Sequence, residues 1–406
     1  MSDLASVLNL DDLRARARRR LPRIVFDFIE GGADDETCLE RNRAGFQRYA
    51  LLPRYLVDVS TRSRSVDFLG HRYDAPYGIS PMGHTGLARP GADLMLASVA
   101  AQANIPYLIS SASNASLEQA VQRAPRNTWF QIYACTDESI NRDLLRRAQS
   151  LAVGTLVVTV DVPVNSNRER NRRNGFGRPP RLSASTVAEA LLHPRWLLDF
   201  YRAGGIPPMG NWLPYSGEPP SSEGAAARFA QLTPDSRLTW DRLERLREQW
   251  PGHLLLKGIL DPADATRAAQ LGVDGLIISN HGGRQFDPAP ASIEMLPFIR
   301  RALGEQMPLV LDGGIRRGSD IVKAFALGAN LVLAGRPWLY GAAVAGARGV
   351  EHVAALLARE LDLTMGQAGI VALNDIDHRR LWAPGDAGLA ALSFGRPGAS
   401  GEAAAP

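Results

Sequence analysis

Residues able to do chemistry gather at one end of the predicted strands. Five successive apolar segments each run into polar or charged side chains, a pattern that a random distribution would not produce. In barrels of alternating strands and helices, active sites form at the carboxyl ends of the strands. The sequence therefore predicts an active site built from Gln131 and Tyr133, Thr159 and Asp161, Lys257, the run 279–284 (Ser-Asn-His-Gly-Gly-Arg) and the run 312–316 (Asp-Gly-Gly-Ile-Arg).

Glycine-rich turns after the last two strands indicate a phosphate site. Asp312-Gly313-Gly314 and Gly335-Arg336-Pro337 follow the seventh and eighth apolar segments. Glycines let backbone N–H groups approach phosphate oxygens closely, and Arg316 or Arg336 adds a forked cationic donor. The loops at these two places in a (β/α)₈ barrel often bind phosphate. The alternative is that the glycines only make tight turns.

Eight apolar, β-branched segments separated by helical patterns define the expected fold. They lie at 76–80, 106–111, 128–133, 155–161, 253–257, 275–279, 308–312 and 330–334. Strands that are apolar along their whole length and alternate with helices are typical of a parallel sheet covered on both faces. We predict an α/β fold, a TIM (β/α)₈ barrel with an N-terminal helical extension. A doubly wound sheet is the alternative.

One connection, between the fourth and fifth strands, is much longer than the others. We place an insertion within it at about 182–235, because a connection of this length in a compact domain is usually functional or disordered. Thr186 and Glu189 have the spacing of a capping box that would open a helix there. We expect residues 1–384 to form one domain that includes this insertion. A tail at 385–406, rich in Ala, Gly and Pro, is expected to be disordered.

Composition excludes several classes of protein. The 406-residue chain has a net charge of only +4, so its arginines favour a solvated surface over a nucleic-acid site. Cys38 and Cys135 make neither a disulfide framework nor a close pair of metal ligands, and no metal site is expected. No apolar run is long enough to span a membrane. We expect a cytoplasmic protein that binds no nucleic acid.

Apolar, aromatic and basic residues are mixed within the insertion at about 185–215. Arg195, Trp196, Phe200, Arg202 and Trp212 are examples. This combination suits contact with a bilayer interface, without crossing the bilayer. It equally suits a lid over the active site or contact with another subunit. If the segment contacts lipid, the protein would lie peripherally on the cytoplasmic face of the membrane.

The sequence resembles the family of FMN-dependent 2-hydroxy acid dehydrogenases and oxidases, from about residue 8 to about residue 375. Arg168-Glu169-Arg170 and His193-Pro194-Arg195-Trp196 are most similar to the (S)-mandelate and L-lactate dehydrogenase branch. The resemblance implies oxidation of a 2-hydroxy acid at C2, bound FMN, and a homo-oligomer, since homotetramers are common in the family. The most specific motifs are Ser279-Asn280-His281-Gly282-Gly283-Arg284-Gln285, Leu311-Asp312-Gly313-Gly314-Ile315-Arg316-Arg317-Gly318 and Leu256-Lys257-Gly258.

The resemblance also implies a role for each polar residue near the substrate. His281 would remove a proton from the substrate, and Asp161 would stabilise the resulting imidazolium. Arg284 and Arg168 would bind the substrate carboxylate, because a planar guanidinium matches a carboxylate with two hydrogen bonds. Tyr133 would donate a hydrogen bond to the reacting end of the substrate.

The resemblance places FMN at the strand ends. Lys257 would lie beside N1 and the C2 carbonyl of the flavin, where its charge stabilises the reduced ring. The absence of a G-x-G-x-x-G fingerprint near the start of the chain favours FMN over FAD. The other predicted contacts are the backbone of Pro81, Met82 and Gly83, the side chains of Ser110, Gln131, Thr159 and Ser279, and the phosphate loops with Asp312, Gly313, Gly314, Arg316, Gly335 and Arg336.

Three residues depart from the family pattern. Phe28 lies where the family usually has a tyrosine that helps to hold the carboxylate, so we expect it to contact the substrate without donating a hydrogen bond. Ala112 lies where the plant glycolate oxidases have a tryptophan, so the pocket should be larger. His84 is either an additional polar contact or a loop residue. Together, Phe28 and Ala112 favour a substrate with an aromatic or long apolar side chain, with mandelate the first to test.

The sequence leaves the electron acceptor open. We expect a dehydrogenase that passes electrons to a quinone or another carrier, and Gly83 favours this by resemblance. The close alternative is an oxidase that reduces O₂ to H₂O₂. A non-catalytic barrel is a further alternative from another class. It should have lost its base or its phosphate site, yet His281, Asp161 and Arg316 are all present.

Overall fold

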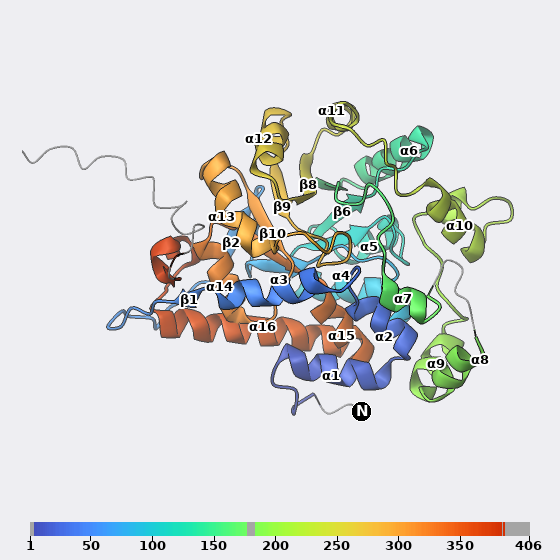
Figure 1. The fold of residues 1–406 in the computed structure, drawn as a ribbon, viewed down its shortest axis with the longest axis horizontal. Helices are drawn as coiled ribbons and strands as arrows, with labels where there is room; N and C mark the ends of the chain where they lie inside the picture. The colour runs from blue at the N-terminus through green and yellow to red at the C-terminus, as the bar shows by residue number, and fades with distance from the viewer. Residues whose placement is uncertain (1–3, 177–182, 384, 386–406) are drawn as a thin grey trace, which may run out of the picture.

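Eight parallel strands close into a barrel in the computed structural model, which describes residues 4–176, 183–383 and 385 (Figure 1). The strands follow chain order around the barrel, and each overlaps one of the eight predicted segments. The predicted TIM barrel is therefore confirmed, and the doubly wound alternative is wrong. The strands are β4 (Tyr77–Ile79), β5 (Tyr107–Ser110), β6 (Thr128–Ile132), β7 (Thr155–Thr159), β8 (His253–Ile259), β9 (Gly275–Ile278), β10 (Leu309–Asp312) and β11 (Leu331–Ala334).

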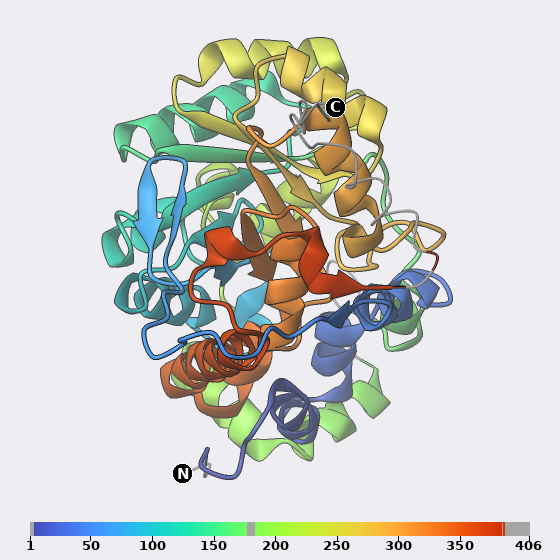
Figure 2. The same ribbon diagram turned by 90° about the vertical axis from the view of Figure 1, so that its left-hand side faces the viewer.

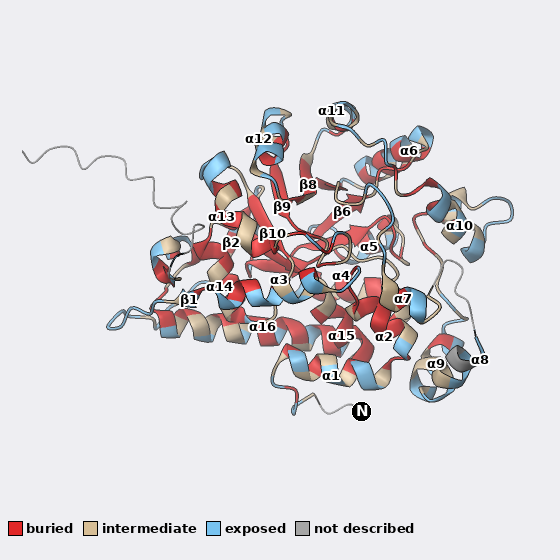
Figure 3. Cartoon of the chain, in the orientation of Figure 1, coloured by how far each residue is buried: buried red, intermediate tan, exposed pale blue. Residues whose placement is uncertain are grey.

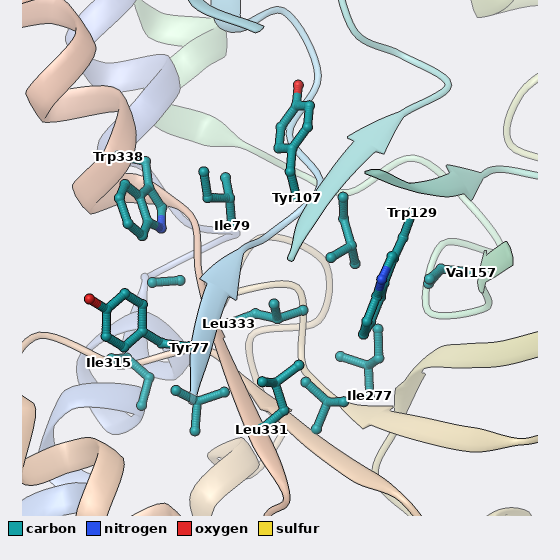
Figure 4. Close-up of a cluster of buried hydrophobic side chains, with 14 of the residues drawn as sticks. Tyr77, Ile79, Tyr107, Trp129, Val157, Ile277, Ile315, Leu331, Leu333 and Trp338 are labelled. Atoms are coloured by element: carbon teal, nitrogen blue, oxygen red, sulfur yellow. The ribbon is translucent and has the colours of Figure 1, made fainter. Parts of the chain in front are cut away.

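The barrel strands are buried on both faces, as their apolar sequences require. Leu254, Leu255 and Leu256 of β8, for example, are fully buried. Figure 4 shows Tyr77 and Trp338 packed together with aliphatic side chains of neighbouring strands. Because side chains from both faces are removed from water, the strands give the fold a continuous apolar core.

Helices cover the outside of the barrel and expose their outer faces (Figure 3). They make the crossovers that parallel strands need. Outside the long connection between β7 and β8, the helices that follow strands are α4 (Ala92–Gln102), α5 (Leu117–Arg123), α6 (Glu138–Ser150), α12 (Pro262–Gln270), α13 (Ser292–Leu303), α14 (Gly318–Ala326), α15 (Arg336–Ala345) and α16 (Ala347–Ala368), with the short 3₁₀ turns η1 (Thr85–Leu87), η3 (Leu373–Asp375) and η4 (His378–Arg380).

An N-terminal extension of three helices packs against the barrel. It consists of α1 (Leu10–Arg20), α2 (Arg23–Glu30) and α3 (Thr37–Gln47). Helix α1 lies against α15 (Figure 1), and Figure 2 shows the dark blue N-terminal helices at the lower end of the molecule. The Asn9 side chain caps α1 by accepting a hydrogen bond from the N–H of Asp12. Two small antiparallel pairs complete this region, β2 (Val66–Phe68) with β3 (His71–Tyr73) and β1 (Ala50–Leu51) with β12 (Leu381–Trp382).

The connection between β7 and β8 carries the predicted insertion. Helix α8 begins at Ala184, so Thr186 lies inside the helix and the predicted capping box is wrong. Glu189 instead accepts a hydrogen bond from the backbone N–H of Arg23 at 2.5 Å. Residue 182 and the predicted tail, apart from Gly385, lie outside the described residues. The elements of the connection are α7 (Glu169–Arg173), α8 (Ala184–Leu191), α9 (Pro194–Arg202), η2 (Leu213–Tyr215), α10 (Ser222–Leu232) and α11 (Trp240–Gln249).

Candidate active site

A cavity of about 510 Å³ opens at the carboxyl ends of the barrel strands, and His281 and Tyr133 line it. The Nδ1 atom of His281 lies 2.9 Å from a carboxylate oxygen of Asp161, and its Nε2 atom lies 3.4 Å from the hydroxyl oxygen of Tyr133. Asp161 thus fixes the ring so that Nε2 is the nitrogen on the Tyr133 side. Burial lowers the pKa of His281 and outweighs the opposing effect of Asp161, so the imidazole is neutral and able to accept a proton near neutral pH.

Gly258 makes room for the carboxylate that orients His281. Its φ is +109°, and the pairing of β8 with β9 shifts register at this point. A Cβ atom on Gly258 would lie 2.5 Å from the Cβ of Asp161, closer than real atoms approach. The strand therefore needs glycine here, both for its backbone conformation and for the close approach of Asp161.

Three arginines surround one side of the cavity. Arg168, Arg284 and Arg336 all line it. Burial, with the positive charges of Arg168 and Arg336, lowers the pKa of Arg284. Three cations brought this close repel one another, so an anion bound between them would be stabilised.

The C-terminal end of α2 holds two of these arginines. Arg284 donates hydrogen bonds to the backbone oxygens of Ile29 and Gly31, at 3.2 and 2.9 Å. Arg336 donates to the same two oxygens and to that of Gly282, all at 3.0 Å. The carbonyl groups at the end of a helix carry partial negative charge, which suits guanidinium groups. The N-terminal extension therefore takes part in building the active site.

Another part of the cavity wall is apolar and aromatic. Phe28 stacks on Phe176 with ring centroids 4.4 Å apart, and the guanidinium carbon of Arg284 lies 5.3 Å from the centre of the Phe28 ring. Phe229 of α10 and Ala112 also line the cavity. Phe28 is thus an apolar wall and a partner for Arg284, as expected for a phenylalanine in the place of a hydrogen-bonding tyrosine.

Lys257 and Asp312 form a buried ion pair at the floor of the cavity. The ammonium nitrogen lies 2.7 Å from a carboxylate oxygen of Asp312 and 2.8 Å from the hydroxyl oxygen of Ser279. Ser279 and Ser80 also donate hydrogen bonds to Asp312, at 2.9 and 2.5 Å. Burial lowers the pKa of Lys257, but the charges of Asp312 and Asp161 and the hydrogen bond to Asp312 together outweigh it. The net shift of the pKa is upward, so a positive charge is held at this position.

The residues present fit an FMN group. Gly313 and Gly314 have φ values of +111° and +84°, a backbone conformation that favours glycine. These glycines, the N-terminus of α15 and Arg316 line one end of the cavity. Backbone N–H groups beside a cation suit a phosphate. Pro81, Met82, Gly83 and Lys257 line the same cavity and suit the edge of a planar ring.

Three of the predicted cofactor contacts lie behind the cavity wall. Ser110 donates a hydrogen bond to Gln131 at 2.6 Å, and Gln131 donates one to Thr159 at 2.8 Å. All three are buried, and none of them lines the described cavity. They form a polar ladder across β5, β6 and β7, and their contact with a cofactor stays a prediction. Ser279, a fourth predicted contact, is also buried and does not line it.

The structure adds site residues that the sequence patterns did not single out. Phe176 and Phe229 line the cavity from the long connection. Gln285 accepts a hydrogen bond from Arg168 at 2.8 Å and so orients that guanidinium. Gln285 belongs to the same motif as His281, so the motif could have identified it as a site residue. No local sequence pattern identifies Phe176 or Phe229 as a site residue. His84 also lines the cavity, with its ring centroid 6.1 Å from that of Phe28.

Fold and site together define a class of protein. Residues 17–383 match the FMN-dependent dehydrogenase family, and the chain belongs to that family. It is therefore an FMN-dependent oxidoreductase, as the motifs predicted. No helix among the described residues has the length and apolar character needed to cross a membrane.

Individual relatives resemble this chain over most of their length. It is 43% identical to the (S)-mandelate dehydrogenase of Pseudomonas putida, over 90% of this chain and 91% of that one. It is 40% identical to the L-lactate oxidase of a Nostoc species, over 93% and 98%. Among solved structures, that of the monotopic membrane protein (S)-mandelate dehydrogenase aligns with a TM-score of 0.89 at 41% identity, covering 93% of this chain and 100% of that one.

Proposed function

We propose that this protein oxidises the C2 hydroxyl of an (S)-2-hydroxy acid with an aromatic or long apolar side chain, giving the 2-oxo acid. The observation that carries the proposal is one cavity that combines an oriented histidine, a cluster of arginines and an aromatic wall. These three features match the hydroxyl, the carboxylate and the side chain of such a substrate. The family and the relatives that act on mandelate and lactate support this substrate class.

Each residue has a defined task in the reaction. The carboxylate of the substrate binds Arg284 and Arg168, which places C2 and its hydroxyl beside Tyr133 and His281. His281 accepts a proton at Nε2, and Asp161 stabilises the positive ring that results. FMN, when bound, supplies the acceptor for the two electrons removed from the substrate. Arg316 and the N-terminus of α15 would hold its phosphate, since the guanidinium of Arg336 is engaged by three carbonyl oxygens.

The proposed acceptor for the electrons of the reduced enzyme is a quinone or another carrier. Oxygen is the second candidate, because a relative that is 40% identical is an L-lactate oxidase. The two are separated by reducing the enzyme with its substrate and mixing it rapidly with either air-saturated buffer or a soluble quinone. Reoxidation that is fast with the quinone and slow with oxygen supports the dehydrogenase, and the reverse result supports the oxidase.

The cavity should favour large apolar substrates over glycolate. Phe28, Phe176 and Ala112 offer apolar surface and space, and burying apolar surface contributes roughly 25 cal/mol per Å². Burial of a phenyl group should contribute a few kcal/mol of binding free energy, and glycolate has no side chain that could contribute it. We expect kcat/KM to be higher for (S)-mandelate and 2-hydroxyoctanoate than for lactate, and lowest for glycolate. A preference for glycolate would contradict the large pocket, and a preference for (R)-mandelate would contradict the proposed handedness.

The bound cofactor should be FMN and not FAD. One phosphate site, formed by the loops after β10 and β11, is what the described cavity offers. Releasing the cofactor by heat and measuring its mass tests this. A mass of FAD would contradict the proposal. Replacing Lys257 by methionine should leave FMN bound but make the flavin harder to reduce, because the positive charge beside the ring is lost.

We also propose that the insertion contacts a membrane surface, in an oligomer of this chain. The segment exposes the large apolar side chains of Leu191, Leu192, Tyr201 and Ile206, and one of the related solved structures is that of a monotopic membrane protein. We expect the protein to sediment with vesicles at low salt. A variant with Leu192 and Tyr201 both replaced by serine should stay in the supernatant. Sedimentation of this variant like the wild type would contradict contact through the insertion.

A further inference from the structure

A second cavity lies outside the active site, between α1, the start of α9, and the junction of α15 with α16. It is an open cleft of about 890 Å³. Among the residues that the structure describes, none that lines it is acidic. We call it the arginine cleft, because its lining includes Arg16, Arg19, Arg20, Arg89, Arg195 and Arg348.

Two arginines of the cleft, Arg19 and Arg195, are exposed and form no ion pair with a described residue. Asp199 on α9 forms ion pairs with two other arginines of the cleft. Its carboxylate oxygen lies 2.6 Å from a guanidinium nitrogen of Arg20 and 3.5 Å from one of Arg89. Burial lowers the pKa of Arg89, and the charge of Arg20 lowers it further, against the effect of Asp199. Several guanidinium groups facing one space favour an anion there, and their planar forks match phosphate oxygens in particular.

The surroundings of the arginine cleft indicate two sources for such a phosphate. Leu192 lines the cleft and is 77% exposed, and its neighbour Leu191 is 65% exposed. Exposed leucines beside a cationic cleft suit the headgroup of an anionic phospholipid. A soluble phosphate ester offers the same chemical group without the membrane. Both ligands present a phosphate group, which the arginines would bind.

Helix α2 connects the arginine cleft to the active site. Arg20 is the last residue of α1, and only Leu21 and Pro22 separate it from the start of α2. The far end of α2 supplies the two carbonyl oxygens that hold Arg284. The helix is eight residues long, which corresponds to about 12 Å at 1.5 Å per residue. A change in how firmly Arg20 is held therefore acts on the element that positions Arg284.

We propose that the arginine cleft binds a phosphate-bearing anion, and that this binding steadies α2 and strengthens binding of the substrate carboxylate at Arg284. The second part rests on the proposed function, in which Arg284 binds that carboxylate. Because coupling between two binding sites is reciprocal, the carboxylate must strengthen binding of the anion by the same factor.

The first experiment tests the arginine cleft as a binding site. Arg19 and Arg195 are both exposed, so R19Q/R195Q should fold normally, and the matched control is R123Q/R126Q, two exposed arginines that do not line the cleft. Calorimetry of the FMN-loaded enzyme with glycerol 3-phosphate, and sedimentation with phosphatidylglycerol and phosphatidylcholine vesicles, give the affinities. We expect R19Q/R195Q to bind the anion at least about tenfold more weakly than wild type and control.

The arms of this experiment separate the sources of the phosphate. Binding of phosphatidylglycerol vesicles alone supports a lipid headgroup, and binding of glycerol 3-phosphate alone supports a soluble ester. If neither depends on Arg19 and Arg195, the arginine cleft is not a phosphate site. If wild type and R19Q/R195Q bind both kinds of vesicle equally and also bind glycerol 3-phosphate equally, membrane contact through the apolar residues is left intact and only the cleft is overturned.

The second experiment tests the coupling. The affinity of benzoylformate, the 2-oxo acid corresponding to mandelate, is measured from the flavin spectrum with and without a saturating phosphate probe. With the phosphate probe bound, we expect the dissociation constant of benzoylformate to be about fivefold lower in wild type and control, and unchanged in R19Q/R195Q. Anion binding without this change would overturn the coupling. Failure of benzoylformate to bind at all would contradict the proposed function, while the calorimetric result would still report on the arginine cleft.

Discussion

Replacing His281 by alanine should lower turnover by roughly 10²–10⁴-fold while FMN stays bound, since this is the usual contribution of a positioned general base. The side chain lines the cavity, and Asp161 holds it with Nε2 toward Tyr133. Rapid mixing of the oxidised enzyme with substrate measures flavin reduction directly.

A control variant separates the loss of the base from general damage. His253 lies at the start of β8, is 44% exposed in its side chain and does not line the described cavity. His253→Ala should therefore reduce its flavin at the wild-type rate. If His281→Ala also does so, His281 is not the base.

The pH dependence follows from the state of the same side chain. The reaction needs neutral His281, so kcat/KM should rise with pH through the pKa of this group and then level off. Burial lowers that pKa below its ordinary value of 6.5, so the rise should lie on the acid side of pH 6.5. A rise centred above pH 7 would contradict a buried imidazole in the free enzyme.

Much of the barrel and part of the site could be predicted from local sequence. The eight strands are short apolar runs, and their polar ends mark the carboxyl side of the barrel, because the period of a buried strand and the position of its last residue are local properties. His281, Tyr133 and Lys257 were located this way. The identity of each as base, donor or cofactor contact came from resemblance and not from the pattern.

The contacts made by the N-terminal extension could not be predicted from local sequence. Nothing in the pattern of α2 shows that the oxygens of Ile29 and Gly31 receive hydrogen bonds from residues more than 250 positions away. The same holds for Phe176, which meets Phe28 only because α2 and the region of α7 pack together. Such contacts depend on how distant elements dock.

Arg284 is the side chain whose loss should, after that of His281, lower activity most. Replacing it by methionine should lower kcat/KM for the 2-hydroxy acid by roughly 30- to 5000-fold, which corresponds to about 2–5 kcal/mol for loss of one partner of a buried charge pair. The fold should survive, because Arg336 still donates hydrogen bonds to the oxygens of Ile29 and Gly31. Arg284→Lys should lose less, since the charge remains but the fork does not.

The methyl ester of the substrate shows whether the effect comes from the carboxylate. Wild-type enzyme should oxidise the ester of mandelate far more slowly than the acid, because the ester offers no negative charge to the arginines. Arg284→Met should then change kcat/KM for the ester little, since the interaction it removes is already missing. The matched control is Arg267→Met, whose arginine also lies over an aromatic ring, 4.9 Å from the centre of Trp240, but does not line the cavity. An equal loss for acid and ester in Arg284→Met would mean that Arg284 acts by holding Phe28 and α2 in place, and would contradict its assignment to the carboxylate.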